Sequence, residues 1–264
     1  MSDGPHGVSA VELRYAVDGP AGAPALMLGG SLGSNLDMWR PQLPALAERF
    51  RVVRYDHRGH GGSPAPPGPY RIEDLGRDAL ALLDRLGLAR AHLGGLSLGG
   101  MVAMWVAANA PERVESLVLL CTSARLGPPQ LWAQRAAAVR EGGMRAVADA
   151  VLARWFTPAF ATAHPDVVDW ARGQLTSTSV DGYAGCCAAI ETMDLEPALG
   201  AITAPTLVLA GADDPATPPQ HAHRIAAGVP GTRVVVVPDA AHLANVEQPE
   251  ATTRSLLDFL GRAP

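Results

Sequence analysis

Residues 91–101 read AHLGGLSLGGM, and this stretch decides the fold. Its first half is a short apolar run that predicts a strand, and the residues from Leu98 onward have the apolar spacing of a helix. Between the two, residues 95–99 (GLSLG) match the pattern G-x-S-x-G, in which a serine stands on a sharp strand-to-helix turn and needs very small neighbours two residues away. Ser97 would then lie at a helix N-terminus, where free N–H groups favour developing negative charge. We predict that Ser97 is a nucleophile, and the alternative is a plain glycine-rich turn.

The composition provides enough apolar material for a buried core. Of the 264 residues, 48% are hydrophobic and 18% are charged, which fits one large or two small α/β domains and gives little sign of disorder. The formal net charge of -5 argues against nucleic acid as a partner, since phosphate binding needs a basic face. The cysteines follow no metal-ligand spacing and are interpreted as reduced, packed thiols: Cys121, Cys186 and Cys187.

The N-terminal residues and the hydropathy of the chain bear on its location. Residues 1–20 lack the basic and apolar regions of a signal peptide. No apolar run approaches the roughly 20 residues that a membrane helix needs. We therefore expect a soluble, cytoplasmic protein without a membrane partner, and the sequence leaves the oligomeric state open.

Short apolar runs alternate with longer helical patterns, which is typical of a mostly parallel sheet. The runs are apolar at successive positions, as expected where helices cover both faces of the sheet. The predicted strands are Val8–Val17, Pro24–Gly30, Arg51–Asp56, Ala91–Leu96, Val114–Cys121, Pro205–Gly211 and Thr232–Pro238. Helices are predicted over Leu75–Leu86 and over Leu98–Asn109, which ends just before Pro111.

This alternation stops between about Thr122 and Pro197, where the patterns are helical and no strand is convincing. A helical segment inserted between two strands of one sheet is interpreted as a cap, or lid, over the site. We therefore predict an α/β-hydrolase fold, with residues 1–121 and 198–264 as the core and 122–197 as the cap.

A serine nucleophile needs a base that is oriented by an acid, and in this fold the chain order is Ser, then Asp or Glu, then His. His242 follows the predicted strand Thr232–Pro238 and is predicted to be the base. Asp213 and Asp214 both follow the strand that ends at Gly211. We favour Asp214 as the acid, because it stands three residues after Gly211 and precedes a proline, and we expect Asp213 to face solvent or cap a helix.

Four further histidines are candidates for other roles. His57 and His60 lie in YDHRGHGGS, where a metal site would lack a third ligand at useful spacing, so we interpret this segment as a structural turn. His221 and His223 lie in a polar helix and are predicted to be solvated. The sequence thus predicts neither a metal nor an organic cofactor.

The sequence resembles the 3-oxoadipate enol-lactonases, hydrolases of bacterial aromatic catabolism, along nearly its whole length. The G-x-S-x-G and RGHG motifs are common to the superfamily, whereas the run from Ser31 to Leu46 and the segment around Trp132 are more selective. The sequence departs from the family at Asp213, where a non-acidic residue is common, and around Cys186 and Cys187. The resembling segments are SLGSNLDMWRPQLPAL, RYDHRGHGGSPAPPGPY, GLSLGGM, LGPPQLWAQRAAAV, PTLVLAGADD and AAHLANVEQP.

The resemblance implies hydrolysis of 3-oxoadipate enol-lactone, a five-membered lactone that carries a carboxylate. Ser97 would attack the carbonyl while His242 takes its proton, and ring opening would expel an enolate that becomes a ketone. Two N–H groups would hold the oxyanion. One is that of Leu98, and the other comes from the loop GGSLGSNLDMW. Counting back from Trp39 puts Gly30-Ser31 where many related hydrolases carry His-Gly, which indicates Leu32 as this second donor.

Trp132 and Arg135 are candidate substrate-binding residues of the cap. They are three residues apart in a segment that follows Pro128–Pro129 and is predicted to be helical, so they share one face. An arginine can bind the carboxylate of the lactone with two hydrogen bonds, and a tryptophan can exclude water and contact the flat ring. The alternative is that Arg135 is solvated and Trp132 packs the cap on the core.

Two other classes of function compete with the lactonase. The same three catalytic residues would serve a general carboxylesterase or a cofactor-free haloperoxidase (perhydrolase). Some proteins of this fold are non-catalytic small-molecule receptors, and the intact order of Ser, Asp and His argues against that role.

Overall fold

A seven-stranded sheet forms the centre of the molecule in the computed structural model, which describes residues 9–261. The strand order is β1-β3-β2-β4-β5-β6-β7, and β1 alone runs antiparallel to its neighbour. The predicted α/β-hydrolase sheet is therefore confirmed. The strands are β1 (Tyr15–Asp18), β2 (Ala25–Gly29), β3 (Arg51–Tyr55), β4 (Ala91–Leu96), β5 (Val114–Leu120), β6 (Thr206–Gly211) and β7 (Arg233–Val237).

The first predicted strand is largely wrong. Its beginning at Val8 lies outside the described residues, and only the end of the segment forms β1. Side chains bind the N–H groups of the backbone before β1: that of Val11 donates to Asp78 Oδ1, and that of Arg14 donates to Ser63 Oγ. The carbonyl of Arg14 accepts from the N–H of Asp56 at 3.0 Å. These bonds hold residues 11–14 in an irregular conformation.

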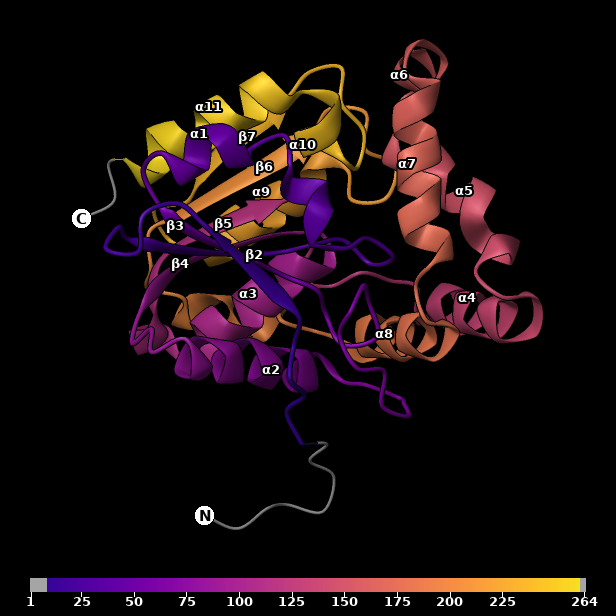
Figure 1. Ribbon diagram of the computed structural model, residues 1–264, viewed down its shortest axis with the longest axis horizontal. Coiled ribbons are helices and arrows are strands. Elements are labelled where there is room, and N and C mark those ends of the chain that lie inside the picture. Colours follow the sequence, from indigo (N-terminus) through magenta and orange to yellow (C-terminus); the bar gives the residue numbers. More distant parts are fainter. Residues whose placement is uncertain (1–8, 262–264) are drawn as a thin grey trace.

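Helices cover both faces of the sheet (Figure 1). Helices α1 (Leu43–Ala47) and α11 (Pro249–Leu260) lie on one face, and α2 (Ile72–Arg85) and α3 (Leu98–Asn109) lie on the other. Helix α9 (Pro219–Gly228) packs against β6 and β7. The inner strands are accordingly buried, whereas β7 is an edge strand on which Val236 is 43% exposed. Helices α9 and α11 both contact β7, so the exposure of Val236 reflects the position of β7 at the edge of the sheet.

Helix α3 has the predicted bounds, and α2 begins three residues before the predicted start. A helix-capping hydrogen bond explains the earlier start. The Asp74 carboxylate accepts from the N–H of Arg71 at 2.8 Å and so satisfies a donor at the N-terminus of the helix.

Five helices lie between β5 and β6 and stand beside the sheet in Figure 1. Where this helical segment leaves and rejoins the sheet, the N–H of Leu195 donates to the carbonyl of Ala124 at 2.8 Å. Helices α4 and α8 pack closely against each other. The five are α4 (Pro129–Gly142), α5 (Arg145–Trp155), α6 (Pro158–Ala163), α7 (Pro165–Thr176) and α8 (Val180–Thr192).

Within residues 9–261, the helices are too short or too polar to span a lipid bilayer.

Candidate active site

The G-x-S-x-G turn adopts the strained geometry that its sequence predicts. Ser97 joins β4 to α3 with φ 56° and ψ −113°, a conformation that residues with side chains rarely adopt. Its glycines allow close approach: a Cβ on Gly95 would lie 2.2 Å from the carbonyl carbon of Gly99, and a Cβ on Gly99 would lie 2.3 Å from the oxygen of Gly29. The turn therefore presents Ser97 at the carboxyl edge of the sheet.

Asp214 lies in the loop after β6 and is buried, with four hydrogen bonds to its carboxylate. Oδ1 accepts from the N–H groups of Ala216 and Thr217, and Oδ2 accepts from the Thr217 hydroxyl at 2.6 Å. The fourth partner is His242, whose Nδ1 lies 2.8 Å from Oδ2. Burial alone would raise the pKa of Asp214, but the nearby imidazole and these hydrogen bonds outweigh it and lower the pKa to about 2. The carboxylate is thus held ionised against the imidazole.

The neighbouring Asp213 faces away from this contact. Its side chain is exposed, and its backbone N–H donates to the carbonyl of Ala240 at 2.9 Å. Of the two adjacent acids, Asp214 is the one that contacts His242.

The loop that carries His242 is bound to the helical segment. The N–H of His242 donates to the carbonyl of Arg154 at 3.3 Å, and that of Leu243 donates to Trp155 at 2.9 Å. The buried Glu247 carboxylate strengthens this connection by accepting from the N–H and the hydroxyl of Thr157, each at 2.8 Å, and from the N–H of Ala241. The position of the imidazole therefore depends on both parts of the molecule.

The two predicted oxyanion donors lie on adjacent segments. The loop after β2 contains Leu32, and α3 begins at Leu98. These segments are joined because the N–H of Gly99 donates to the carbonyl of Gly30 at 2.9 Å. Within residues 9–261, the N–H groups of Leu32 and Leu98 have no acceptor, so both are available to a ligand.

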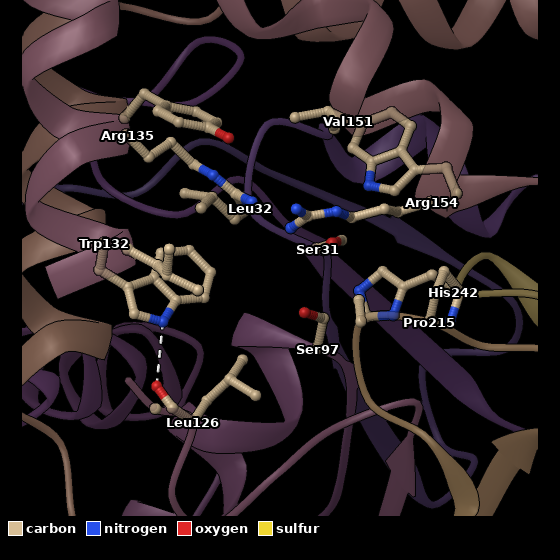
Figure 2. A pocket seen from close by; sticks show the side chains of 15 residues that line it. Ser31, Leu32, Ser97, Leu126, Trp132, Arg135, Val151, Arg154, Pro215 and His242 are labelled. Atoms are coloured by element: carbon tan, nitrogen blue, oxygen red, sulfur yellow. Dashed lines mark hydrogen bonds between the residues drawn. The ribbon is translucent and has the colours of Figure 1, made fainter. Parts of the chain in front are cut away.

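A cavity of about 250 Å³ lies between the sheet edge and the helices, and it is the site that Figure 2 shows. Ser97, His242 and Leu32 line it from the core. Trp132 and Arg135 line it from α4, as their spacing predicts, with the Arg135 guanidinium 4.7 Å from the centre of the Trp132 ring system. The indole N–H of Trp132 donates to the carbonyl of Leu126 at 2.9 Å and fixes the ring in the wall.

Sequence reasoning missed Arg154 and Tyr183, which also line the cavity. In Figure 2 the guanidinium groups of Arg154 and Arg135 extend from opposite walls toward each other. Partial burial and the positive charge of Arg135 lower the pKa of Arg154. In the part of the chain that the structure describes, neither arginine forms an ion pair with a carboxylate. An arginine in the apolar segment LARWF was the signal that could have drawn attention to Arg154.

The other histidines divide into buried and exposed ones. His57 and His60 are both buried beside the loop after β2, and residues 9–261 contain no cluster of three or more His, Cys, Asp or Glu residues suited to a metal ion. The prediction of a solvated His221 is wrong: its Nδ1 lies 2.7 Å from the Ser123 hydroxyl, and partial burial lowers its pKa. His223 is exposed as predicted.

Comparison with known proteins identifies the family. The model of the alpha/beta hydrolase fold family matches residues 24–249. The chain belongs to this family and is a hydrolase.

Individual relatives confirm the resemblance to enol-lactonases. The chain is 41% identical to 3-oxoadipate enol-lactonase 2 of Acinetobacter baylyi, over 91% of this chain and 90% of that one. The crystal structure of the enol-lactonase from Burkholderia xenovorans LB400 matches with a TM-score of 0.94 and 44% identity, covering 96% and 97% of the two chains. A provisionally named carbamate hydrolase of Variovorax paradoxus is 36% identical over 95% of this chain and 96% of its own length.

Proposed function

We propose that the protein hydrolyses a carboxylic ester bond through an acyl-enzyme on Ser97, with His242 as the base and Asp214 as the orienting acid. The observation that carries this proposal is the ionised, buried Asp214 carboxylate 2.8 Å from His242 Nδ1, beside a serine on a strained turn in the same cavity. With Nδ1 donating to Asp214, the other imidazole nitrogen is free to accept the Ser97 proton. Ser97 and His242 line the same cavity, no hydrogen bond joins their side chains within residues 9–261, and we expect one to form when substrate binds.

The acylation step forms a bond between Ser97 Oγ and the carbonyl carbon, and His242 takes the hydroxyl proton. The carbonyl oxygen becomes an oxyanion, which the N–H groups of Leu32 and Leu98 would stabilise at the N-terminus of α3. Collapse of this intermediate breaks the bond to the leaving oxygen. The proton that His242 took from Ser97 passes to the leaving group, which makes the imidazole neutral again. His242 then takes a proton from water while the water oxygen attacks the acyl carbon. Breaking the bond from that carbon to Ser97 Oγ releases the acid, and His242 returns the proton to Ser97.

We propose 3-oxoadipate enol-lactone as the substrate, in bacterial degradation of aromatic compounds. The support is the pair of cavity-facing arginines without a carboxylate partner within residues 9–261, together with the named enol-lactonase relatives. Arg135 and Arg154 would bind the lactone carboxylate, and Trp132 would contact the flat ring and exclude water. Ring opening breaks the bond between the acyl carbon and the ring oxygen, and the enolate that leaves takes a proton on carbon to become the ketone of 3-oxoadipate.

Residues 122–197 would serve as the cap of this site. The cap contributes Trp132, Arg135 and Arg154, whereas Ser97, Asp214 and His242 come from the core. The chemistry needs no metal or organic cofactor, and a cytoplasmic location remains a prediction from the sequence.

A small carbamate is the competing substrate, because a relative bears the name of a carbamate hydrolase. An uncharged carbamate or a simple ester would leave both arginines without an anionic partner in a partly closed cavity, which costs binding energy. This difference favours the anionic lactone over a general carboxylesterase, a perhydrolase or a carbamate hydrolase.

The test is a turnover assay that compares the enol-lactone with para-nitrophenyl acetate and a small carbamate. We expect kcat/KM for the lactone to exceed that for each uncharged substrate by about 100-fold or more. A charge-assisted hydrogen bond to the carboxylate, together with the orientation that it gives the lactone, accounts for a ratio of this size. Faster turnover of the carbamate would overturn the assignment of the lactone as substrate. If Ser97 does not react with a fluorophosphonate, the hydrolase mechanism is overturned, and the alternative of a non-catalytic small-molecule receptor takes its place.

A further inference from the structure

The peptide group that would donate from Leu32 is held between two buried imidazoles. Its N–H belongs to the peptide that joins Ser31 to Leu32. The carbonyl of Gly30, in the preceding peptide, lies 3.0 Å from His57 Nε2. The N–H of Gly33, in the following peptide, donates to His60 Nε2 at 2.9 Å. Both neighbours of the donor peptide are therefore fixed by side chains of the loop after β3.

The bonding partners determine the protonation of each ring. A carbonyl can only accept, so Nε2 of His57 carries a proton that it donates to Gly30. In His60 the proton is on the other nitrogen. Its Nε2 accepts from the N–H of Gly33, and its Nδ1 carries the proton and lies 3.1 Å from the carbonyl of Arg58. Burial lowers the pKa of His57 to about 3 and also lowers that of His60, which keeps both rings neutral. The two histidines are thus complementary tautomers.

The same carbonyl connects this loop to the nucleophile. Gly30 accepts from His57 and also from the N–H of Gly99, in the first turn of α3. Leu98 directly precedes Gly99. One carbonyl therefore joins the two segments that present Leu32 and Leu98, and His57 donates to that same carbonyl.

We propose that His60, with His57 beside it, is a positioning residue that orients the Leu32 N–H toward the oxyanion of the transition state. This inference rests on the proposed function, because Leu32 has this task only in a serine hydrolase.

Ser34 closes a turn over this loop, because its N–H and its hydroxyl donate to the carbonyl of Ser31 at 3.0 and 2.8 Å. The peptide between Leu32 and Gly33 is the central peptide of that turn, and His60 binds its N–H. Without the acceptor on His60, the turn is held less precisely, and so is the Leu32 donor relative to the position where the negative charge develops. A preorganised donor stabilises the transition state more than the ground state, so the loss appears in kcat and not in KM.

The experiment compares His60→Leu, which removes the acceptor, with His60→Gln, whose side-chain oxygen can accept at the position of Nε2. The substrate is para-nitrophenyl acetate, and the inhibitor is phenylboronic acid, which forms a tetrahedral adduct with a serine. His92→Leu is the matched control, because His92 is also buried and hydrogen bonded, to Ser116 Oγ at 2.8 Å, but lies near the opposite end of β4.

We expect His60→Leu to lower kcat by about 10- to 100-fold, part of the effect of deleting an oxyanion donor, with KM changed by less than about threefold. Its affinity for the boronate should fall by a similar factor. His60→Gln should recover kcat to within about tenfold of the native protein, and His92→Leu should change kcat by less than about twofold although it removes a buried ring. Equal losses for His60→Leu and His92→Leu, no recovery in His60→Gln, or unchanged boronate affinity would each overturn the proposal.

A measurement on the native protein covers the case in which His60→Leu does not fold. Nitrogen NMR of the histidine rings distinguishes the two tautomers, and we expect one ring with its proton on Nδ1 and an unprotonated Nε2 coupled across a hydrogen bond to the Gly33 amide. A proton on Nε2 of His60 would refute the assignment. These readouts use a neutral ester, the boronate and the free protein, so failure of the enol-lactone assay leaves the test intact.

Discussion

The core edge and residues 122–197, the proposed cap, differ in how they place their functional groups. At the core edge, each group follows a parallel strand: Ser97 follows β4, Asp214 follows β6 and His242 follows β7. Backbone geometry fixes these positions, since the carboxyl ends of neighbouring parallel strands meet at one edge of the sheet. In the cap, Trp132, Arg135 and Arg154 project from helices, and their positions depend on how those helices pack.

This difference separates chemistry from selectivity. The core edge holds a serine, an imidazole and a carboxylate, which can open many esters. The cap holds two arginines that extend toward each other and suit an anionic partner. Changes in the core should therefore abolish turnover of every substrate, whereas changes in the cap should discriminate between substrates.

The largest effect is expected from Ser97→Ala. Removal of the nucleophile should lower kcat by about 10⁴- to 10⁶-fold on the lactone and on a neutral ester alike, as in other serine hydrolases. The melting temperature should change little, because the substitution removes one hydroxyl from a side chain that lines the cavity and leaves the Cβ and the strained backbone as they are. Steady-state kinetics and a melting curve check both expectations. A variant that retains a tenth of the native activity would move the nucleophile elsewhere.

The next effect distinguishes the two adjacent acids. Asp214→Asn should lower kcat by about 10³- to 10⁴-fold, because an amide neither holds the imidazole in the required tautomer nor stabilises its charged form. Asp213→Asn should cost less than about tenfold, since this exposed carboxylate only adds to the surrounding field. Both variants are measured with the same ester. The opposite ranking would assign the orienting role to Asp213.

The sequence predicts the core edge well because its constraints are local. The G-x-S-x-G turn needs small residues where Gly95 and Gly99 approach their neighbours, and those letters are visible without a structure. The choice of Asp214 over Asp213 followed from its offset after the strand, and in the structure Asp214 is the residue that contacts His242.

The cap is harder to predict because its contacts are not local. Arg154 reaches the cavity only through the packing of α5, and its backbone meets His242, 88 positions away in the numbering. The interpretation of His57 and His60 as a structural turn did not reveal the bonds to Gly30 and Gly33, which lie 27 residues back along the chain. Spacing rules describe one element at a time and do not show which elements meet.

A cap variant should separate the two regions. Arg135→Ala should raise KM for the anionic lactone by about 10- to 100-fold, the loss of a charge-assisted hydrogen bond, and should change hydrolysis of an uncharged aryl acetate far less. Arg154→Ala should behave in the same direction, and Arg145→Ala, on an exposed arginine of α5, is the control for loss of charge. Kinetics on both substrates provide the ratio. Equal losses on the lactone and the aryl acetate would mean that these arginines support the cap.

The smallest effect is expected where the two regions join, at Glu247. Its carboxylate accepts from Thr157 in the cap and from Ala241, the residue before His242. Glu247 therefore couples the position of the His242 imidazole to that of the cap. In Glu247→Gln an N–H₂ donor replaces one of the two acceptor oxygens. Both oxygens accept from a backbone N–H group, so in either orientation of the amide two donors face each other and one hydrogen bond is lost. We expect kcat to fall by about tenfold and the free energy of unfolding by about 1–3 kcal/mol, because a buried donor is left unsatisfied. Both the lactone and the neutral ester should lose activity, unlike the arginine variants, since the displaced group is His242. A loss confined to the lactone, measured beside Glu250→Gln as a control on α11, would show instead that Glu247 acts only through the cap.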